Sequence, residues 1–106
     1  MKLLTDELRA VLPPLYAQEN TKDPMVYAKF FTPDSSWTWY VTEGSAEEHD
    51  FIFFGYVIGL EREWGYFSLI ELESVRGPLG LPIERDLYFE PKRFGELQQG
   101  ELAYEN

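Results

Sequence analysis

The residues from Ser36 to Thr42 alternate strictly between apolar and hydroxyl-bearing side chains, and this pattern constrains the fold more than any other. Trp37, Trp39 and Val41 occupy the apolar positions. Successive side chains of a β-strand point to opposite faces, so the period of two predicts a strand whose two tryptophans face the core. The preceding Thr32-Pro33-Asp34-Ser35 has the composition of a tight turn. A β-hairpin therefore lies at the centre of the expected fold.

Other extended segments enlarge this hairpin into a meander. Met25 to Thr32 alternates ahead of the turn, and Phe51 to Leu60 is apolar on both faces, as an inner strand is. Glu61-Arg62-Glu63 turns the chain into a fourth strand that ends at Phe67. Ile83 to Glu90 is a fifth extended segment whose neighbour in the sheet is left open, and Glu43 to Asp50 is expected to be an exposed loop without basic residues.

Helix signals flank the strands. Thr5 is a candidate N-cap for a short helix that ends before Pro13, and Ser68 with Glu71 has the spacing of a capping box that starts a second helix at Leu69. Pro91 can open a third helix. We therefore expect an α+β fold: a four- to five-stranded, mainly antiparallel meander sheet with short N-terminal, central and C-terminal helices. One domain is expected over residues 1–106, with residues 101–106 as a frayed acidic tail.

Composition excludes several classes of function. The 106 residues contain no cysteine, which rules out disulfides, thiolate nucleophiles and cysteine-based zinc sites. Nineteen acidic against nine basic residues give a formal charge of −10, which disfavours direct binding to nucleic acid or to anionic membranes. The N-terminus lacks the pattern of an export signal, and the longest apolar run is too short to span a bilayer. We expect a cytoplasmic protein without a cofactor.

No motif identifies a catalytic site. His49 is the single histidine and no Gly-x-Ser-x-Gly turn occurs, so a catalytic triad is not expected. The cluster Glu47, Glu48, His49 and Asp50 lacks the ligand spacing and central glycine of a calcium loop, so no metal site is predicted. The sequence therefore favours a non-enzymatic protein.

Three aromatic residues are candidates for an exposed, partner-binding patch: Tyr40, Trp64 and Tyr66. They lie on the less apolar strand face or near a turn, and Glu61 and Glu63 flank them. Exposed tryptophan and tyrosine with a charged rim is the composition of a protein-binding hot spot. The alternative is that these rings serve ordinary cross-strand packing.

A second hypothesis is a small-ligand-binding protein or hydrolase with a pocket between sheet and helices. Its polar lining would come from Glu73, Arg76, Glu84 and Arg85. Such glutamates and arginines can instead form a buried network or a solvated surface.

Several blocks resemble the family known as domain of unknown function 2958. The resemblance covers roughly Leu3 to Phe89 and includes the stretch from Glu71 to Asp86. Its other blocks are Leu3-Leu4-Thr5, Leu12-Pro13-Pro14-Leu15-Tyr16, Lys29-Phe30-Phe31-Thr32-Pro33, Trp37-Thr38-Trp39-Tyr40, Phe54-Gly55-Tyr56-Val57 and Gly65-Tyr66-Phe67-Ser68.

The resemblance implies a small bacterial protein carried by plasmids, integrative elements or phages, and it transfers no catalytic or binding residue. A mobile-element protein of this size and charge suggests, by analogy, an inhibitor of a host defence system of the anti-CRISPR or anti-restriction type. Its expected partner is a protein, for which a basic nucleic-acid-binding complex is one candidate.

Overall fold

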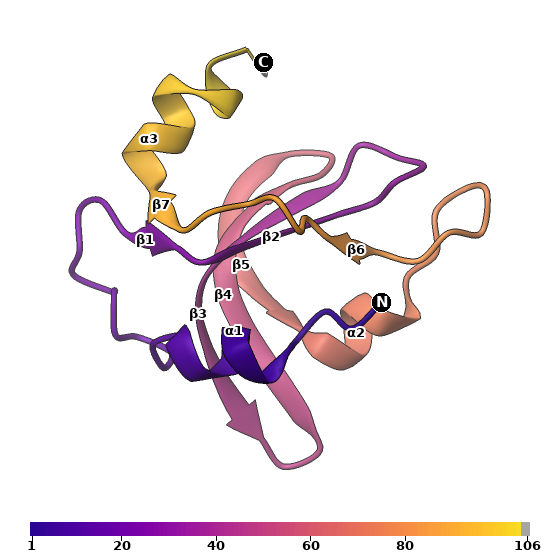
Figure 1. The fold of residues 1–106 in the computed structure, drawn as a ribbon, viewed down its shortest axis with the longest axis horizontal. Coiled ribbons are helices and arrows are strands. Elements are labelled where there is room, and N and C mark those ends of the chain that lie inside the picture. Colours follow the sequence, from indigo (N-terminus) through magenta and orange to yellow (C-terminus); the bar gives the residue numbers. More distant parts are fainter. Residues whose placement is uncertain (105–106) are drawn as a thin grey trace.

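The polypeptide forms a curved antiparallel sheet with helices packed against it (Figure 1). The computed structural model describes residues 1–104. Within them the strands are β1 (Met25–Val26), β2 (Ala28–Phe31), β3 (Thr38–Glu47), β4 (Asp50–Ile58), β5 (Arg62–Ser68), β6 (Glu84–Arg85) and β7 (Lys92–Arg93). The helices are α1 (Asp6–Val11), α2 (Leu69–Ser74), α3 (Phe94–Gln99) and the 3₁₀ helix η1 (Glu101–Tyr104).

The main sheet has five strands in the order β5-β4-β3-β2-β6, and β1 pairs with β7 in a separate two-stranded sheet. Every pair is antiparallel. Strands β2 to β5 follow one another in both sequence and space, so the predicted α+β fold with a meander sheet is confirmed. The open position of the fifth segment is also settled, because β6 pairs with the outer side of β2.

The region from Glu43 to Asp50 differs from its prediction. Strand β3 continues to Glu47 and β4 starts at Asp50, so most of the expected loop is the end of a long hairpin. The register shifts between Val41 and Glu43, which marks a β-bulge with Thr42 as the extra residue. The bulge breaks the period of two, and for this reason the alternation no longer identifies the strand beyond Thr42.

Local capping explains where the first two helices begin. The Thr5 hydroxyl accepts the Leu8 amide at 3.1 Å, and Leu12 ends α1 in extended conformation before Pro13. The Ser68 hydroxyl accepts the Glu71 amide at 3.1 Å while the Glu71 carboxylate accepts the Ser68 amide at 3.2 Å. The predicted capping box is therefore present, and α2 begins at Leu69 as expected.

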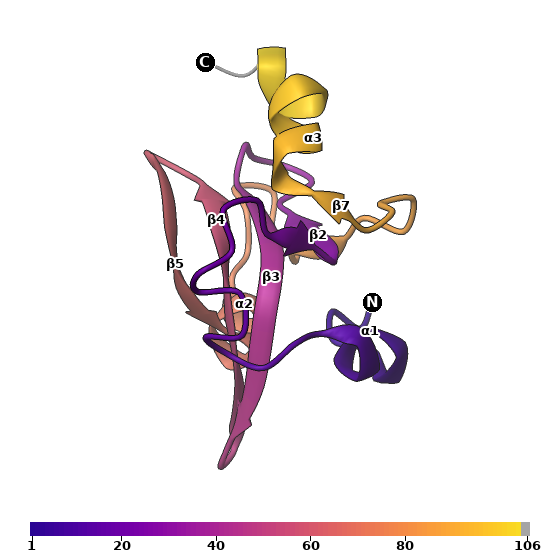
Figure 2. The same ribbon diagram turned by 90° about the vertical axis from the view of Figure 1, so that its left-hand side faces the viewer.

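The sheet carries a hydrophobic core on each face. The first core packs α1 and α2 against one face, with Phe30, Phe53 and Phe67 in contact at its centre. The second packs α3 and η1 against the other face, through Phe94, Leu97 and Leu102. In Figure 2, α3 lies at the top of the view and α1 lies apart from it, lower down beside the sheet, and β5 lies at the outer edge of the sheet.

Two expectations about side chains and termini are wrong. Trp39 is buried, but Trp37 precedes β3, stacks on Trp39 and is still 37% exposed. The C-terminal segment is not frayed over residues 101–104, because Leu102 is buried and Glu101 accepts hydrogen bonds from Lys29 at 2.7 Å and from Tyr40 at 2.6 Å. The expected fraying of residues 105–106 lies outside the described residues.

Candidate functional site

The predicted partner-binding residues lie in different environments. Trp64 and Tyr66, on β5, are 40% and 56% exposed. Tyr40 is 0% exposed, so its expected exposure is wrong. It lies on β3 in the middle of the sheet and is covered by the second core, while its hydroxyl donates to Glu101.

The register of β5 separates the remaining candidates. Trp64 pairs with Tyr56, which packs against the second core, whereas Glu63 pairs with Val57, which packs against the first. Because neighbouring residues of a strand point to opposite faces, Glu63 is on the face away from Trp64. Glu61 lies in the turn before β5. Only the two aromatic residues, Trp64 and Tyr66, therefore share one face.

Aromatic rings continue from β5 inward along this face. Phe54 lies 4.8 Å from Tyr66 and is stacked on Trp64 at 6.0 Å, measured between ring centroids. Trp64 also contacts Phe94 of α3 at 4.7 Å. Aromatic pairs at these separations contribute beyond their buried area, so the partly exposed rings of β5 are held in place from beneath.

A residue that sequence reasoning missed completes this surface. Tyr16, in the segment between α1 and β1, is 61% exposed, and its ring meets Tyr66 edge-on at 6.3 Å. Tyr16 has a φ of 75°, a left-handed conformation that is uncommon for residues with a side chain. Tyr16, Trp64 and Tyr66 together form an exposed surface that we name the aromatic patch.

The segment that carries Tyr16 is fixed to β3 by hydrogen bonds of the Glu43 and Gln18 side chains. Glu43 is only 3% exposed, and its two carboxylate oxygens accept the amides of Tyr16 at 2.8 Å and of Gln18 at 2.7 Å. The Gln18 side chain donates to the carbonyls of Met25 and Thr42 and accepts the Met25 amide. These bonds compensate for the burial of a charged group and hold Tyr16 in its strained conformation.

Between this segment and the sheet lies a cavity of about 360 Å³, which we name the aromatic pocket. Desolvation raises the pKa of the Tyr66 hydroxyl, and the adjacent Tyr16 hydroxyl and the charges of Glu43 and Glu19 raise it further. The pocket is lined by Tyr16, Gln18, Glu19, Thr21, Lys22, Pro24, Thr42, Glu43, Phe54, Trp64 and Tyr66.

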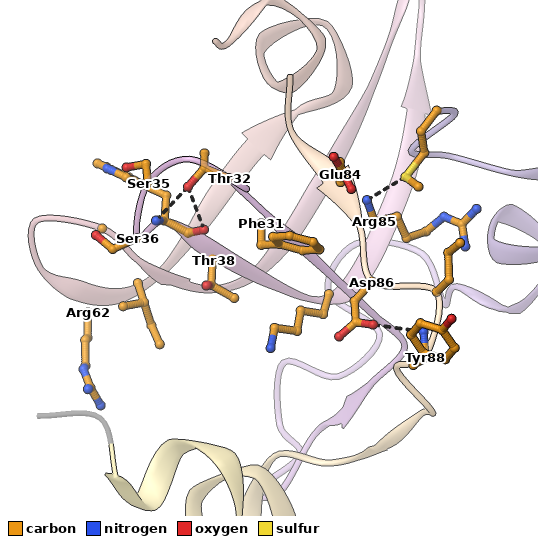
Figure 3. A pocket seen from close by; sticks show the side chains of 16 residues that line it. Phe31, Thr32, Ser35, Ser36, Thr38, Arg62, Glu84, Arg85, Asp86 and Tyr88 are labelled. Atoms are coloured by element: carbon orange, nitrogen blue, oxygen red, sulfur yellow. Dashed lines mark hydrogen bonds between the residues drawn. The ribbon is translucent and has the colours of Figure 1, made fainter. Parts of the chain in front are cut away.

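A second, wider cavity of about 830 Å³ lies beside β2 and β6 (Figure 3). Its lining includes the basic residues Lys29, Arg62 and Arg85. Figure 3 shows Arg62 and Arg85 on opposite sides of the cavity, with side chains that do not converge. Lys29 is paired with Glu101 at 2.7 Å. The basic groups of this wide cavity therefore do not form a common anion-binding point.

The four residues proposed for a ligand pocket are not gathered here. Glu84 and Arg85 line the wide cavity, whereas Glu73 and Arg76 do not. Arg76 donates from Nη1 to the carbonyl oxygens of Glu73 and Val75 at 3.0 and 2.8 Å. Its guanidinium is thus used to close the end of α2.

In the acidic hairpin around His49, the Asp50 carboxylate has a structural role. Asp50 Oδ1 accepts the amides of Phe51 at 2.7 Å and Ile70 at 3.1 Å. Desolvation opposes ionisation, but these hydrogen bonds lower the pKa of Asp50 overall. Across residues 1–104 no group of three or more histidine, aspartate or glutamate side chains is placed to hold a metal ion. The same residues include no helix long and apolar enough to cross a membrane.

Comparison with known proteins identifies one relationship. The family model described as "Protein of unknown function (DUF2958)" matches residues 3–95. Neither the curated proteins nor the solved structures include a match. Because the matched region spans most of the 106 residues, the chain belongs to the DUF2958 family.

Proposed function

We propose that this protein is a non-enzymatic interaction module that binds a basic partner protein through the aromatic patch. The observation that carries the proposal is the exposure of Trp64 and Tyr66 on the outermost strand of the main sheet. Tryptophan and tyrosine are enriched among residues that dominate binding energy, because each offers a large contact area at a low cost in side-chain entropy.

The edge position of β5 strengthens this proposal. An edge strand presents unpaired backbone groups, and proteins usually protect such edges with proline, charges or a covering element. Strand β5 has seven residues and no proline, and its charges lie at one end, on Arg62 and Glu63. A partner segment can therefore contact the aromatic patch and the backbone of the strand together.

Charge indicates the chemistry of the partner. The chain has a formal charge of −10. Glu19 lines the aromatic pocket beside the exposed rings, and Glu61 lies in the turn before β5. Opposite charge on a partner increases the rate of association and excludes competitors of like charge. We propose that the protein is an inhibitor carried by a mobile element. Its proposed partner is a basic nucleic-acid-binding protein, such as a component of a host defence complex.

Small-ligand binding receives less support. The wide cavity has no convergent pair of arginines, and its Lys29 is already bonded to Glu101. We therefore do not assign it a ligand.

Affinity capture from a bacterial lysate tests the proposal. Tyr66→Ala is the test variant and Tyr88→Ala is its matched control, because Tyr88 is 93% exposed and lies on the wide cavity instead. We expect Tyr66→Ala and Glu61→Lys to lose the captured protein, and Tyr88→Ala to keep it. Equal recovery by Tyr66→Ala and Tyr88→Ala would contradict the role of the patch.

The partner class has its own test. Binding to a basic nucleic-acid-binding protein should weaken steeply as salt is raised and should compete with duplex DNA. A captured partner that is indifferent to both salt and DNA would be of another class.

A further inference from the structure

The walls of the aromatic pocket combine two features that cations require. Phe54, Trp64 and Tyr66 present their rings, and Glu19 and Glu43 bring carboxylates. Aromatic faces attract cations through the negative potential above the ring, most strongly at tryptophan. Lys22 is the basic residue of the lining, so two carboxylates outweigh one ammonium group.

The negative character of the pocket is fixed in the fold. Glu43 is almost completely buried and is held by the Tyr16 and Gln18 amides. Each oxygen accepts one of these bonds, and a carboxylate oxygen has a further lone pair that a second donor can use. The raised pKa of Tyr66 agrees with this picture, since the charges of Glu43 and Glu19 contribute to it after desolvation and the Tyr16 hydroxyl.

Contacts within the chain hold the wall of the pocket that Tyr16 and Gln18 provide. The strained backbone of Tyr16 is held by Glu43, and Gln18 ties the same segment to both Met25 and Thr42. A preformed site loses less conformational entropy when it binds than a site that must order itself. Backbone strain of this kind persists only where surrounding contacts support it.

We propose that the aromatic pocket receives the guanidinium group of an arginine side chain from the partner protein. Arginine fits better than lysine because its planar group stacks on aromatic faces and donates several hydrogen bonds in one plane. Trp64 and Tyr66, which line the pocket and are 40% and 56% exposed, provide the aromatic surface, and Glu19 and Glu43 provide the acceptors. This inference rests on the proposed function and specifies how the basic partner is recognised.

A short peptide with one central arginine is the probe, and the same peptide with citrulline, which has nearly the same shape but no charge, is its control. Nuclear magnetic resonance titration of the whole protein should show shifts of the Trp64 indole and of the amides from Tyr16 to Lys22. We expect the arginine peptide to bind at least about fivefold more tightly than the citrulline peptide. Tyr66→Ala should weaken the arginine peptide by a similar factor, and Tyr88→Ala should leave its affinity unchanged.

Equal affinity for both peptides, or shifts centred on the wide cavity of Figure 3, would overturn the inference. If capture of a partner depends on Tyr66 but the arginine peptide does not bind, the inference is wrong and the proposed function stands. If the peptide binds as expected but capture does not depend on Tyr66, the proposed function is wrong, and so is the assignment of the guanidinium to a partner protein.

Discussion

Replacing Glu43 with glutamine tests whether this buried carboxylate holds the segment that carries Tyr16. The carboxylate accepts two backbone amides at 2.8 and 2.7 Å, whereas a glutamine side chain offers a single oxygen and an NH₂ group. In Glu43→Gln, one of the two amides therefore loses its acceptor and faces a donor instead. The shape of the side chain is nearly unchanged, so the effect reports on hydrogen bonding and charge.

The size of the effect follows from these two bonds. A hydrogen bond to a charged group contributes about 1.5–3 kcal/mol, and Glu43 at 3% exposure has little competing water. We expect Glu43→Gln to lower the free energy of unfolding by about 1.5–3 kcal/mol. At about 4 °C per kcal/mol for a domain of roughly this size, the melting temperature should fall by about 6–12 °C.

Urea denaturation followed by tryptophan fluorescence measures the global effect, and hydrogen exchange measures the local one. If only the segment around Tyr16 opens, exchange at the Tyr16 and Gln18 amides should accelerate by about 10- to 100-fold. Glu47→Gln is the matched control, because Glu47 lies on the same strand, is exposed, and should change stability by less than about 0.5 kcal/mol. A Glu43→Gln protein with wild-type stability and wild-type exchange at both amides would refute the anchoring role.

Two further predictions concern the inner strands and the C-terminal segment. Gly55→Ala should cost at least about 2 kcal/mol in urea denaturation, because a Cβ there would collide with the Tyr40 carbonyl oxygen, whereas Gly65→Ala, opposite it on β5 with no heavy atom within 4 Å, should be tolerated. For Glu101, desolvation raises its pKa, but the hydrogen bonds from Lys29 and Tyr40 outweigh this, and the net pKa is lowered from its ordinary 4.5. A group whose pKa is lowered by folding stabilises the folded state at pH values above its ordinary pKa. This stabilisation is lost as the pH falls below that value and the carboxylate becomes protonated. Urea midpoints from about pH 6 to about pH 3 should therefore fall less steeply in Glu101→Gln than in the wild type; equal slopes would contradict the role of the ionised carboxylate.

Local patterns in the sequence specify much of this fold. The alternation from Ser36 to Thr42 places Trp39 and Val41 in the core, and the spacing of Ser68 and Glu71 defines the start of α2. These predictions succeed because capping and strand alternation depend on residues within a few positions of one another.

The extension of β3 could not be found in this way. The acidic stretch from Glu43 to Asp50, with Gly44 and no basic residue, predicts an exposed loop, yet Glu43 lies within β3 and is covered. Its compensation comes from the amides of Tyr16 and Gln18, which are 27 and 25 positions away in the sequence. The bulge between Val41 and Glu43 also removes the alternation that would have signalled a strand.

The candidate site was predicted in part. The exposure of Trp64 and Tyr66 agrees with their position near a turn, whereas Tyr40 is buried although its hydroxyl and its hydroxyl-bearing neighbours suggested a polar face. Tyr16 had no local signal at all, since only the fold brings it to Tyr66. The structure explains the position of Tyr16 through the buried Glu43 carboxylate, which accepts the amides of Tyr16 and Gln18, and no local sequence pattern indicates these bonds.

One cross-strand row of aromatic residues shows why the sheet is open where it is. Tyr40, Tyr56 and Trp64 are paired side by side on β3, β4 and β5, and their exposure rises from fully buried at Tyr40 to 40% at Trp64. The six-residue helix α3 covers this row only as far as the contact between Phe94 and Trp64. Burying apolar surface stabilises a fold or a complex by about 25 cal/mol for each Å². Within residues 1–104, Trp64 and Tyr66 on β5 stay partly exposed, so part of their surface does not contribute this stabilisation. The partner that we propose would obtain it by covering Trp64 and Tyr66, beside the Tyr16 ring that Glu43 holds in place.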